Sequence, residues 1–251
     1  HAWSGAARAV AFEGYRSIAL DLRGHGESDW AADGDYSLEA IARDLIEVGE
    51  HVARGGTRPH VVGASLGGLA AIVAAGMLSR DAFESVTLVD ITPNMDAAGV
   101  TKVVGFMGAH VHEGFDSLEQ AADVIATYLP HRPRPKDLEG LRKNLRQGED
   151  GRWRWHWDPA FITGVMRRSG VAHTGDLEQA VRDIRVPLHL IRGRMSELVS
   201  EDSVAAFRSL APQAHYTDVA GARHMVAGDR NDVFIEAVVS FLRTIREQTP
   251  V

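Results

Sequence analysis

Short apolar runs alternate with helical segments over the first ninety residues, and this alternation most limits the folds open to the chain. The apolar runs cover residues 17–21, 60–63 and 86–90. Two helical patterns lie between them, one beginning after Ser37 and one rich in Gly and Ala over 66–78. A strand, helix, strand order implies right-handed crossovers in a parallel sheet covered on both faces. We therefore predict an α/β protein with a mostly parallel, doubly wound sheet.

The alternation stops after Ile91 and resumes near residue 182. The sequence between is polar and helix-prone, and prolines interrupt it. We predict a helical cap or lid over 92–181, inserted into a core formed by 1–91 and 182–251. Further strands are expected at 186–191 and 215–219, with a helix over 203–210. The last helix, 233–245, carries one apolar stripe: Phe234, Val238, Phe241 and Ile245.

Charge and composition indicate which kinds of binding partner the protein has. The formal net charge is −7 and the sequence pI is about 5.9, which disfavours nucleic-acid and anionic membrane surfaces. The chain has no cysteine, and it has no apolar run long enough to cross a bilayer. We expect a cytoplasmic protein with a small-molecule, ester-like substrate, no nucleic-acid partner and no membrane. The sequence leaves the oligomeric state open. The sequence opens at His1 without an initiator methionine, and it leaves open whether residues precede it.

The strongest chemical motif is Gly63-Ala64-Ser65-Leu66-Gly67-Gly68, which follows an apolar strand and opens a helix. In this context a G-x-S-x-G motif is typical of a strained turn that presents a serine nucleophile. The flanking glycines are expected because side chains there would collide with backbone. Ser65 is therefore the candidate nucleophile. The N–H of Leu66, at the helix N-terminus, is the candidate oxyanion donor.

A serine hydroxyl needs a base, and His224 is the histidine best placed to act as one. It lies in the loop after the last predicted strand, at the carboxyl edge of the sheet, where ligand chemistry gathers. Four other histidines, His110, His112, His131 and His156, fall in the predicted cap.

Two carboxylates compete to orient that histidine. Glu197 follows the strand before the last one, and Asp90 ends the strand after the nucleophile's helix. We favour Glu197, because its loop neighbours the His224 loop if sequential elements are adjacent in space. Asp90 is the alternative acid.

Three stretches together resemble the α/β-hydrolase family, in its serine-nucleophile, esterase-like branch. They are Asp21-Leu22-Arg23-Gly24-His25-Gly26-Glu27-Ser28, the turn at Ser65 and the Gly221-Ala222-Arg223-His224 loop. The resemblance covers essentially the whole chain and implies an eight-stranded sheet, an inserted cap and a Ser-acid-His triad. It also implies an N-terminal His-Gly oxyanion loop, which would lie at or before His1. The family more often has Asp where this chain has Glu197.

The serine favours hydrolysis of a small carboxylic ester through an acyl-enzyme, because family members acting on halides or epoxides use Asp at that turn. No metal or organic cofactor is needed, and none is expected. Lactone hydrolysis, C–C bond hydrolysis and cofactor-free perhydrolase or haloperoxidase activity would use the same site. A non-catalytic ligand-binding protein is the alternative from another class.

Three tryptophans with alternating spacing, Trp153, Trp155 and Trp157, lie near the end of the predicted cap. In an extended segment they would share one side. They are candidate substrate-binding residues that line an acyl pocket, and the alternative is that they anchor the cap to the core.

Overall fold

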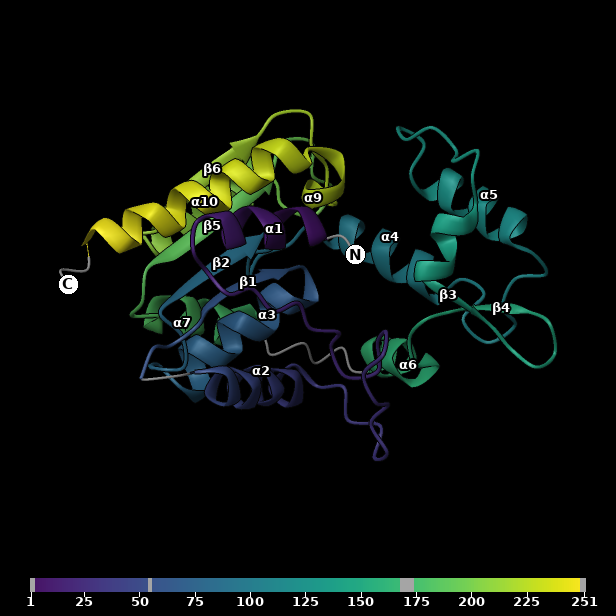
Figure 1. The fold of residues 1–251 in the computed structure, drawn as a ribbon, viewed down its shortest axis with the longest axis horizontal. Helices are drawn as coiled ribbons and strands as arrows, with labels where there is room; N and C mark the ends of the chain where they lie inside the picture. Colours follow the sequence, from purple (N-terminus) through teal and green to yellow (C-terminus); the bar gives the residue numbers. More distant parts are fainter. Residues whose placement is uncertain (1–2, 54–55, 168–173, 249–251) are drawn as a thin grey trace. The chain divides into compact units, whose positions relative to one another are not determined.

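The computed structural model describes residues 3–53, 56–167 and 174–248. The chain divides into two compact units, whose elements are labelled in Figure 1. The first, named the sheet unit, comprises His1–Leu20, Ser37–Val100 and Gly170–Val251. The second, named the insert unit, comprises Asp21–Tyr36 and Thr101–Ser169. Both units are therefore built from segments that lie far apart in the sequence.

Four parallel strands form the main sheet, in the order β1-β2-β5-β6. They are β1 His60–Ala64, β2 Ser85–Val89, β5 Leu188–Gly193 and β6 His215–Val219. The register pairs Ala64 with Val89, and Ile191 with both Val89 and Thr217. The carboxyl ends of the strands therefore meet at one edge of the sheet. These four strands confirm the expected ones at nearly the expected positions.

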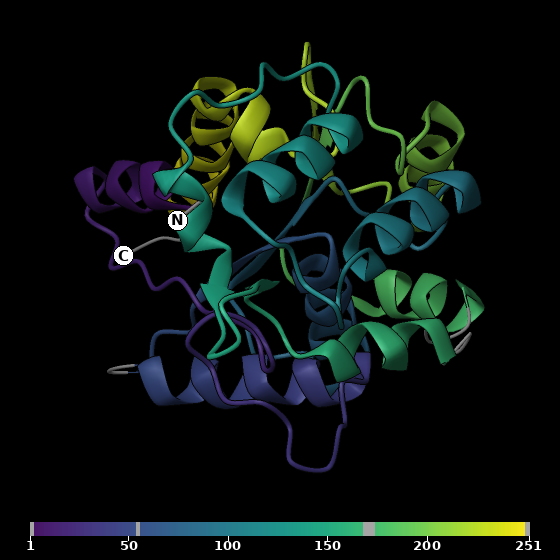
Figure 2. The same cartoon turned by 90° about the vertical axis from the view of Figure 1, so that its right-hand side faces the viewer.

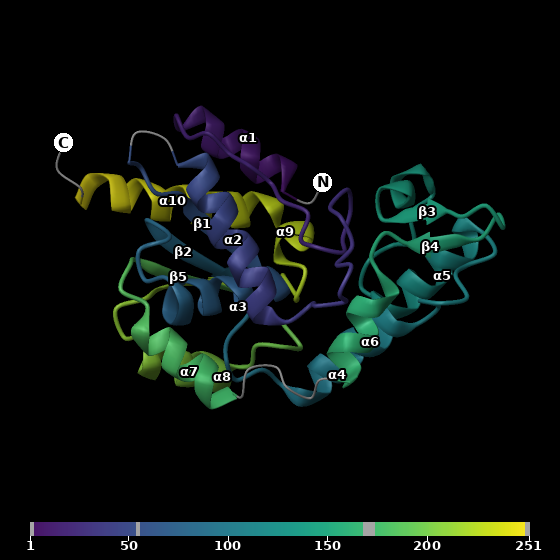
Figure 3. The same cartoon turned by 90° about the horizontal axis from the view of Figure 1, so that it is seen from below.

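Helices cover both faces of this sheet (Figure 1, Figure 3). Helices α1 (Ser4–Phe12) and α10 (Asn231–Gln248) lie on one face, while α2 (Leu38–Val52), α3 (Leu66–Val73) and α7 (Thr174–Asp183) lie on the other. The remaining helical elements of the unit are η1 Ala74–Leu78, a π-helical extension of α3, α8 Glu201–Leu210 and α9 Val226–Asp229. This is the doubly wound α/β arrangement that the alternation predicted.

The apolar stripe of α10 supplies much of the core on its face of the sheet. Phe234, Val238, Phe241 and Ile245 are each no more than 5% exposed. Phe234 and Val238 pack with Val89, Ile191 and Val219, which come from three different strands. Burying such a stripe against a sheet is the main stabilisation of an amphipathic helix.

One expected strand is absent from the described residues. Residues 17–21 have no strand partner, and the side chains of Ile18 and Leu20 are 45% and 41% exposed. An apolar run becomes a strand only when a neighbour supplies its ladder of hydrogen bonds, and hydrophobicity alone does not report that neighbour. The described sheet accordingly has four strands, where the family resemblance implied eight.

The insert unit combines short helices with an antiparallel strand pair, β3-β4 (Figure 2). Its elements are α4 Ala97–Gly108, whose first residues belong to the sheet unit, α5 Leu118–Tyr128, η2 Glu139–Lys143, β3 Leu145–Gln147, β4 Trp153–Trp155 and α6 Pro159–Arg167. It has a core of its own, formed by Phe115, Leu118, Ala121, Leu145, Trp153 and Trp155.

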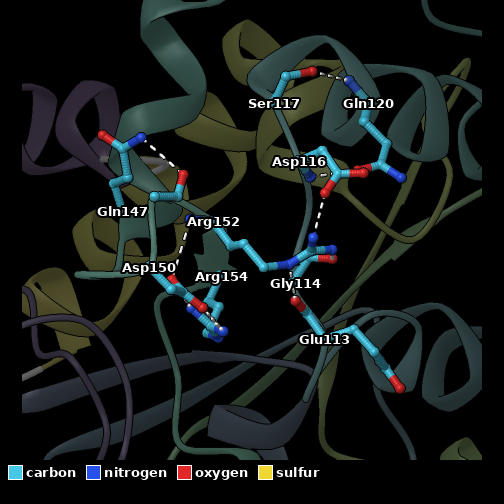
Figure 4. Close-up of polar contacts among 10 residues, drawn as sticks. Glu113, Gly114, Asp116, Ser117, Gln120, Gln147, Asp150, Arg152 and Arg154 are labelled. Atoms are coloured by element: carbon cyan, nitrogen blue, oxygen red, sulfur yellow. Dashed lines mark hydrogen bonds and ion pairs between the residues drawn. The ribbon is translucent and has the colours of Figure 1, made fainter.

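Two arginines, one in the turn between β3 and β4 and one in β4, make several polar contacts within the insert unit (Figure 4). The Arg152 guanidinium contacts the Asp116 carboxylate and donates to the backbone carbonyls of Glu113 and Gly114. Arg154 donates to both carboxylate oxygens of Asp150, at 2.9 and 2.6 Å. These charged contacts join the strand pair to the loop before α5 and close the turn between the strands.

The segment Asp21–Tyr36, expected in the core, groups with the insert unit. The N–H of Asp158 donates to the Gly24 carbonyl at 2.7 Å, and the N–H of Gly26 donates to the His156 carbonyl at 2.8 Å. The buried Tyr36 hydroxyl donates to Asp158, and burial together with this hydrogen bond raises the pKa of Tyr36 to about 12. The insert unit thus shares 101–169 with the predicted cap and differs from it at both ends, since α7 groups with the sheet.

Within the described ranges, no helix combines the length and apolar character needed to cross a membrane. The same residues contain no group of three or more His, Asp or Glu side chains arranged to hold a metal ion.

Candidate active site

Ser65 occupies a strained position at the turn from β1 into α3. Its φ is +48° and its ψ is −119°, a left-handed conformation that non-glycine residues rarely adopt. Its N–H donates to the Val89 carbonyl at 3.3 Å, and its carbonyl accepts from Gly68 and Leu69 in the first helical turn. The side chain makes no capping hydrogen bond to the helix. Strain of this kind persists only where the surroundings enforce it, and it concentrates at functional sites.

Close packing around Ser65 leaves room only for glycine at two positions. The sequence motif indicated one of these two positions but not the other. A Cβ at position 63 would lie 2.4 Å from the Gly67 carbonyl oxygen. A Cβ at position 68 would lie 2.4 Å from Cγ2 of Ile91 and 2.9 Å from the Gly63 oxygen. A Cβ at position 67 would meet nothing within 4 Å. Close packing of the helix against the turn therefore depends on Gly63 and Gly68, whereas the motif pointed to Gly63 and Gly67.

Asp90 follows β2, the strand next to β1, and is completely buried. Its φ is +51°, so it too has a left-handed backbone. Oδ1 accepts the Gly193 N–H at 2.9 Å. Oδ2 accepts two hydrogen bonds, one from the Ser196 hydroxyl at 2.6 Å and one from Nδ1 of His224 at 2.8 Å. Three donors thus satisfy a carboxylate that water does not reach, as a buried charged group requires.

His224 lies in the loop between β6 and α9, and its side chain is 10% exposed. Because Asp90 is an acceptor, Nδ1 carries the proton in this pairing. The other ring nitrogen, Nε2, is then the basic atom of the neutral imidazole. The loop lies close to the end of β5, since a Cβ at Gly193 would lie 2.3 Å from the Arg223 carbonyl oxygen.

Of the two candidate acids, Asp90 makes the hydrogen bond to His224. Glu197 lies in the loop after β5, where its backbone packs against the start of α4: a Cβ at Gly99 would lie 2.0 Å from the Glu197 carbonyl oxygen. The preference for Glu197 assumed that its loop neighbours the His224 loop, and it does, because β5 lies beside β6. However, β2 also lies beside β5, so the same loop reaches Asp90 through Ser196, and Asp90 is the residue that contacts the histidine.

Gly193, the last residue of β5, and Ser196, in the loop that contains Glu197, were not singled out by the sequence. The Ser196 hydroxyl also accepts hydrogen bonds from the N–H groups of Leu198 and Val199, at 3.0 and 3.1 Å. An Asp at the end of a predicted apolar strand was the available signal for the carboxylate. Nothing in the sequence distinguishes its donors.

Leu66 is the first residue of α3, so its N–H has no acceptor within the helix. It directly follows Ser65 and lies at the positive end of the helix dipole, where a developing negative charge would be stabilised. The donor that the motif indicated therefore has a suitable position.

The tryptophans lie within the insert unit. Trp153 and Trp155 are each 7% exposed and belong to the unit's own core. Trp157 is partly buried, and its ring stacks on Trp155 with 4.8 Å between the ring centroids. Trp153 and Trp155 therefore contribute to the internal packing of the insert unit.

The chain belongs to the α/β-hydrolase fold family, because the model of that family matches residues 1–230. An esterase of Mycobacterium tuberculosis is 30% identical over 92% of this chain and 76% of its own. A 2-(acetamidomethylene)succinate hydrolase of Mesorhizobium japonicum is also 30% identical, over 91% of this chain and 78% of its own.

Solved structures agree with this assignment. A crystal structure of an E-2-(acetamidomethylene)succinate hydrolase has a TM-score of 0.76 at 26% identity, over 96% of this chain and 87% of its own. A structure of the M. tuberculosis esterase has a TM-score of 0.71 at 29% identity, over 97% of this chain and 81% of its own.

Proposed function

We propose that this chain is a hydrolase of small carboxylic esters, with Ser65 as nucleophile, His224 as general base and Asp90 as the acid that orients the imidazole. The observation that carries the proposal is the hydrogen bond of 2.8 Å between the buried Asp90 carboxylate and Nδ1 of His224. That pairing lies at the carboxyl edge of the sheet, where the strained Ser65 immediately precedes α3. Asp90 thereby replaces Glu197 as the favoured acid.

The first half of the reaction acylates the serine. Nε2 of His224 takes the proton of Ser65 while Oγ attacks the ester carbonyl carbon, and the carbonyl oxygen becomes an oxyanion next to the Leu66 N–H. The imidazolium then gives its proton to the alkoxy oxygen as the C–O bond breaks. The alcohol departs, and the acyl group remains on Oγ.

The second half repeats these transfers with water. His224 takes a proton from water, and the resulting hydroxide attacks the acyl carbon. When the tetrahedral intermediate collapses, His224 returns the proton to Oγ of Ser65 and the carboxylic acid is released. Each cycle consumes one ester and one water and releases one alcohol and one carboxylic acid, so it calls for no cofactor.

Asp90 acts through the histidine. Its hydrogen bond fixes the proton on Nδ1, which leaves Nε2 free to accept the serine proton. Its negative charge, in a water-excluded position, stabilises the imidazolium that forms at each step. Gly193 and Ser196 hold the carboxylate in the orientation that this role demands.

The names of the relatives support an ester substrate, since esterases of M. tuberculosis and Escherichia coli are among them, at 30% and 25% identity. The 2-(acetamidomethylene)succinate hydrolase supports a second candidate, a small anionic acid carrying a cleavable acyl bond. Lactone, C–C and perhydrolase chemistry would use the same three side chains.

The insert unit is our candidate for the substrate-selecting cap. Of its three tryptophans, Trp157 is the one that remains a candidate substrate contact, because it is partly buried whereas the other two lie in the core. Replacing Trp157 by Ala should shift preference among acyl chain lengths. A lower melting temperature with unchanged preference would assign it to anchoring.

A fluorophosphonate probe tests the proposed function, because it reacts only with an activated serine. The parent protein should be labelled and should hydrolyse p-nitrophenyl acetate, whereas Ser65→Ala should do neither. A panel of neutral esters and 2-(acetamidomethylene)succinate then separates the two substrate candidates. Absence of labelling in the folded parent would instead favour a non-catalytic ligand-binding protein.

A further inference from the structure

Two exposed methionines flank the groups that converge on Asp90. Ser196 and His224 donate to the same carboxylate oxygen, Oδ2, at 2.6 and 2.8 Å. Met195 immediately precedes Ser196, and Met225 immediately follows His224. One oxygen atom thus holds together the two loops on which these methionines lie.

The backbones of the two loops are also in direct contact. The N–H of Met195 donates to the Ala222 carbonyl at 2.9 Å, and that of Arg194 donates to the Val219 carbonyl at 3.0 Å. Ala222 itself is completely buried between them. The backbone of Met195 is therefore held against the loop that carries His224, and Met225 directly follows that histidine.

Both methionine side chains remain open to solvent, Met195 at 50% and Met225 at 45% exposure. Apolar side chains so close to a candidate catalytic base are available to contact a substrate. Methionine suits such a contact, because its unbranched, polarisable thioether adapts to apolar groups of different shapes.

The chemistry of the proposed reaction decides which part of an ester lies on this side. The imidazolium must protonate the leaving alkoxy oxygen, so the alcohol portion lies next to His224. The oxyanion faces the Leu66 N–H at the start of α3. The loops that carry Met195 and Met225 both converge on Asp90, the partner of His224, so of the two portions of the ester the alcohol is the one that lies toward them.

We propose that Met195 and Met225 form the contact surface for the alcohol portion of the substrate, and that this portion is an uncharged alkyl or aryl group. The inference rests on the proposed ester hydrolysis and extends it to the leaving group. It makes these methionines specificity-determining residues for alcohol length, while selection of the acyl portion lies elsewhere.

Two ester series test the proposal. One varies the alcohol at constant acyl group, from ethyl to hexyl acetate, and the other varies the acyl group at constant alcohol, from ethyl acetate to ethyl hexanoate. The parent protein is compared with Met195→Gln/Met225→Gln, in which side chains of similar length become polar. The control is Met77→Gln, because Met77 is 51% exposed on η1, roughly three helical turns beyond Ser65.

We expect the double variant to lose about tenfold in kcat/KM for hexyl relative to ethyl acetate, the effect of roughly two methylene contacts. The ratio within the acyl series should stay as in the parent. Met195→Leu/Met225→Leu should restore the preference for hexyl acetate, and Met77→Gln should behave as the parent does.

An unchanged alcohol series, or a change of equal size in the acyl series, would overturn the assignment of these methionines. Fluorophosphonate labelling of Ser65 is measured on every variant alongside the ester series. A parent protein that is neither labelled nor active on any ester would contradict the proposed function itself. A labelled, active enzyme with an unaltered alcohol preference would contradict only the role of Met195 and Met225.

Discussion

Nδ1 of His224 lies 2.8 Å from Oδ2 of Asp90, a carboxylate with no solvent exposure. Such a pairing fixes one imidazole tautomer and creates a basic Nε2. Substitutions at Asp90 and at Glu197, the two candidate acids, are therefore expected to affect activity differently.

Asp90→Asn should lower kcat by about 10⁴, because an amide can present an N–H where the histidine needs an acceptor. Glu197→Gln should keep most of the parent activity. Steady-state hydrolysis of p-nitrophenyl acetate measures both, with circular dichroism to confirm that each variant folds. A folded, nearly normal Asp90→Asn beside an inactive Glu197→Gln would return the role to Glu197.

Ser196→Ala should lower kcat about tenfold and the free energy of unfolding by about 1–3 kcal/mol. The substitution removes one donor from Asp90 and the acceptor for the Leu198 and Val199 N–H groups. The matched control is Ser209→Ala, which removes only an exposed hydroxyl bonded within its own helix. Equal effects of the two substitutions on kcat would argue against a positioning role for Ser196.

Gly67→Ala and Gly68→Ala should have opposite effects on stability. Alanine at 68 would strike Ile91 and the Gly63 backbone, an overpacking that costs about 1–3 kcal/mol. Alanine at 67 meets open space and should stabilise the helix by about 0.5–1 kcal/mol. Urea unfolding compares the two. If Gly67→Ala were the more damaging change to stability, the packing described around Ser65 would be wrong.

His189 makes the stability of the sheet unit depend on pH. Burial, and to a lesser degree the charge of His215, lowers the pKa of His189 to about 4, from 6.5. The folded state therefore keeps His189 neutral between pH 4 and 6.5, whereas the unfolded chain takes up a proton there. Its contribution is fully present above pH 6.5 and is lost as the pH falls toward 4.

His189→Gln should accordingly flatten the fall in unfolding free energy between pH 7 and pH 5, by about 2 kcal/mol. Urea unfolding at the two pH values measures this difference. His51→Gln, at an exposed position near the end of α2, is the control and should leave the slope unchanged. A slope in His189→Gln as steep as that of the parent would contradict the account.

Local patterns in the sequence predicted the elements of the sheet unit well. Alternating apolar runs identified β1, β2, β5 and β6, and the stripe from Phe234 to Ile245 is buried as its spacing required. Residues 17–21 failed as a strand because strand formation depends on a neighbour, which a local pattern does not contain.

The candidate site was predictable only in part, for a similar reason. Ser65 and His224 stand out because each has a local motif at a sheet edge. Choosing Asp90 over Glu197 depends on β2 lying beside β5, which is a property of the whole sheet. Likewise, the hydrogen bonds that tie Gly24 and Gly26 to residues 156–158 join segments too distant for any spacing rule to reveal.

Mass spectrometry after reaction with a fluorophosphonate, followed by peptide mapping, tests whether Ser65 is a nucleophile activated by His224. We expect a single covalent adduct on Ser65, formed fast in the parent and in Met77→Gln. Formation should be slower by several orders of magnitude in His224→Ala and absent in Ser65→Ala. An adduct on another residue, or equal labelling rates in the parent and in a folded His224→Ala, would contradict this expectation.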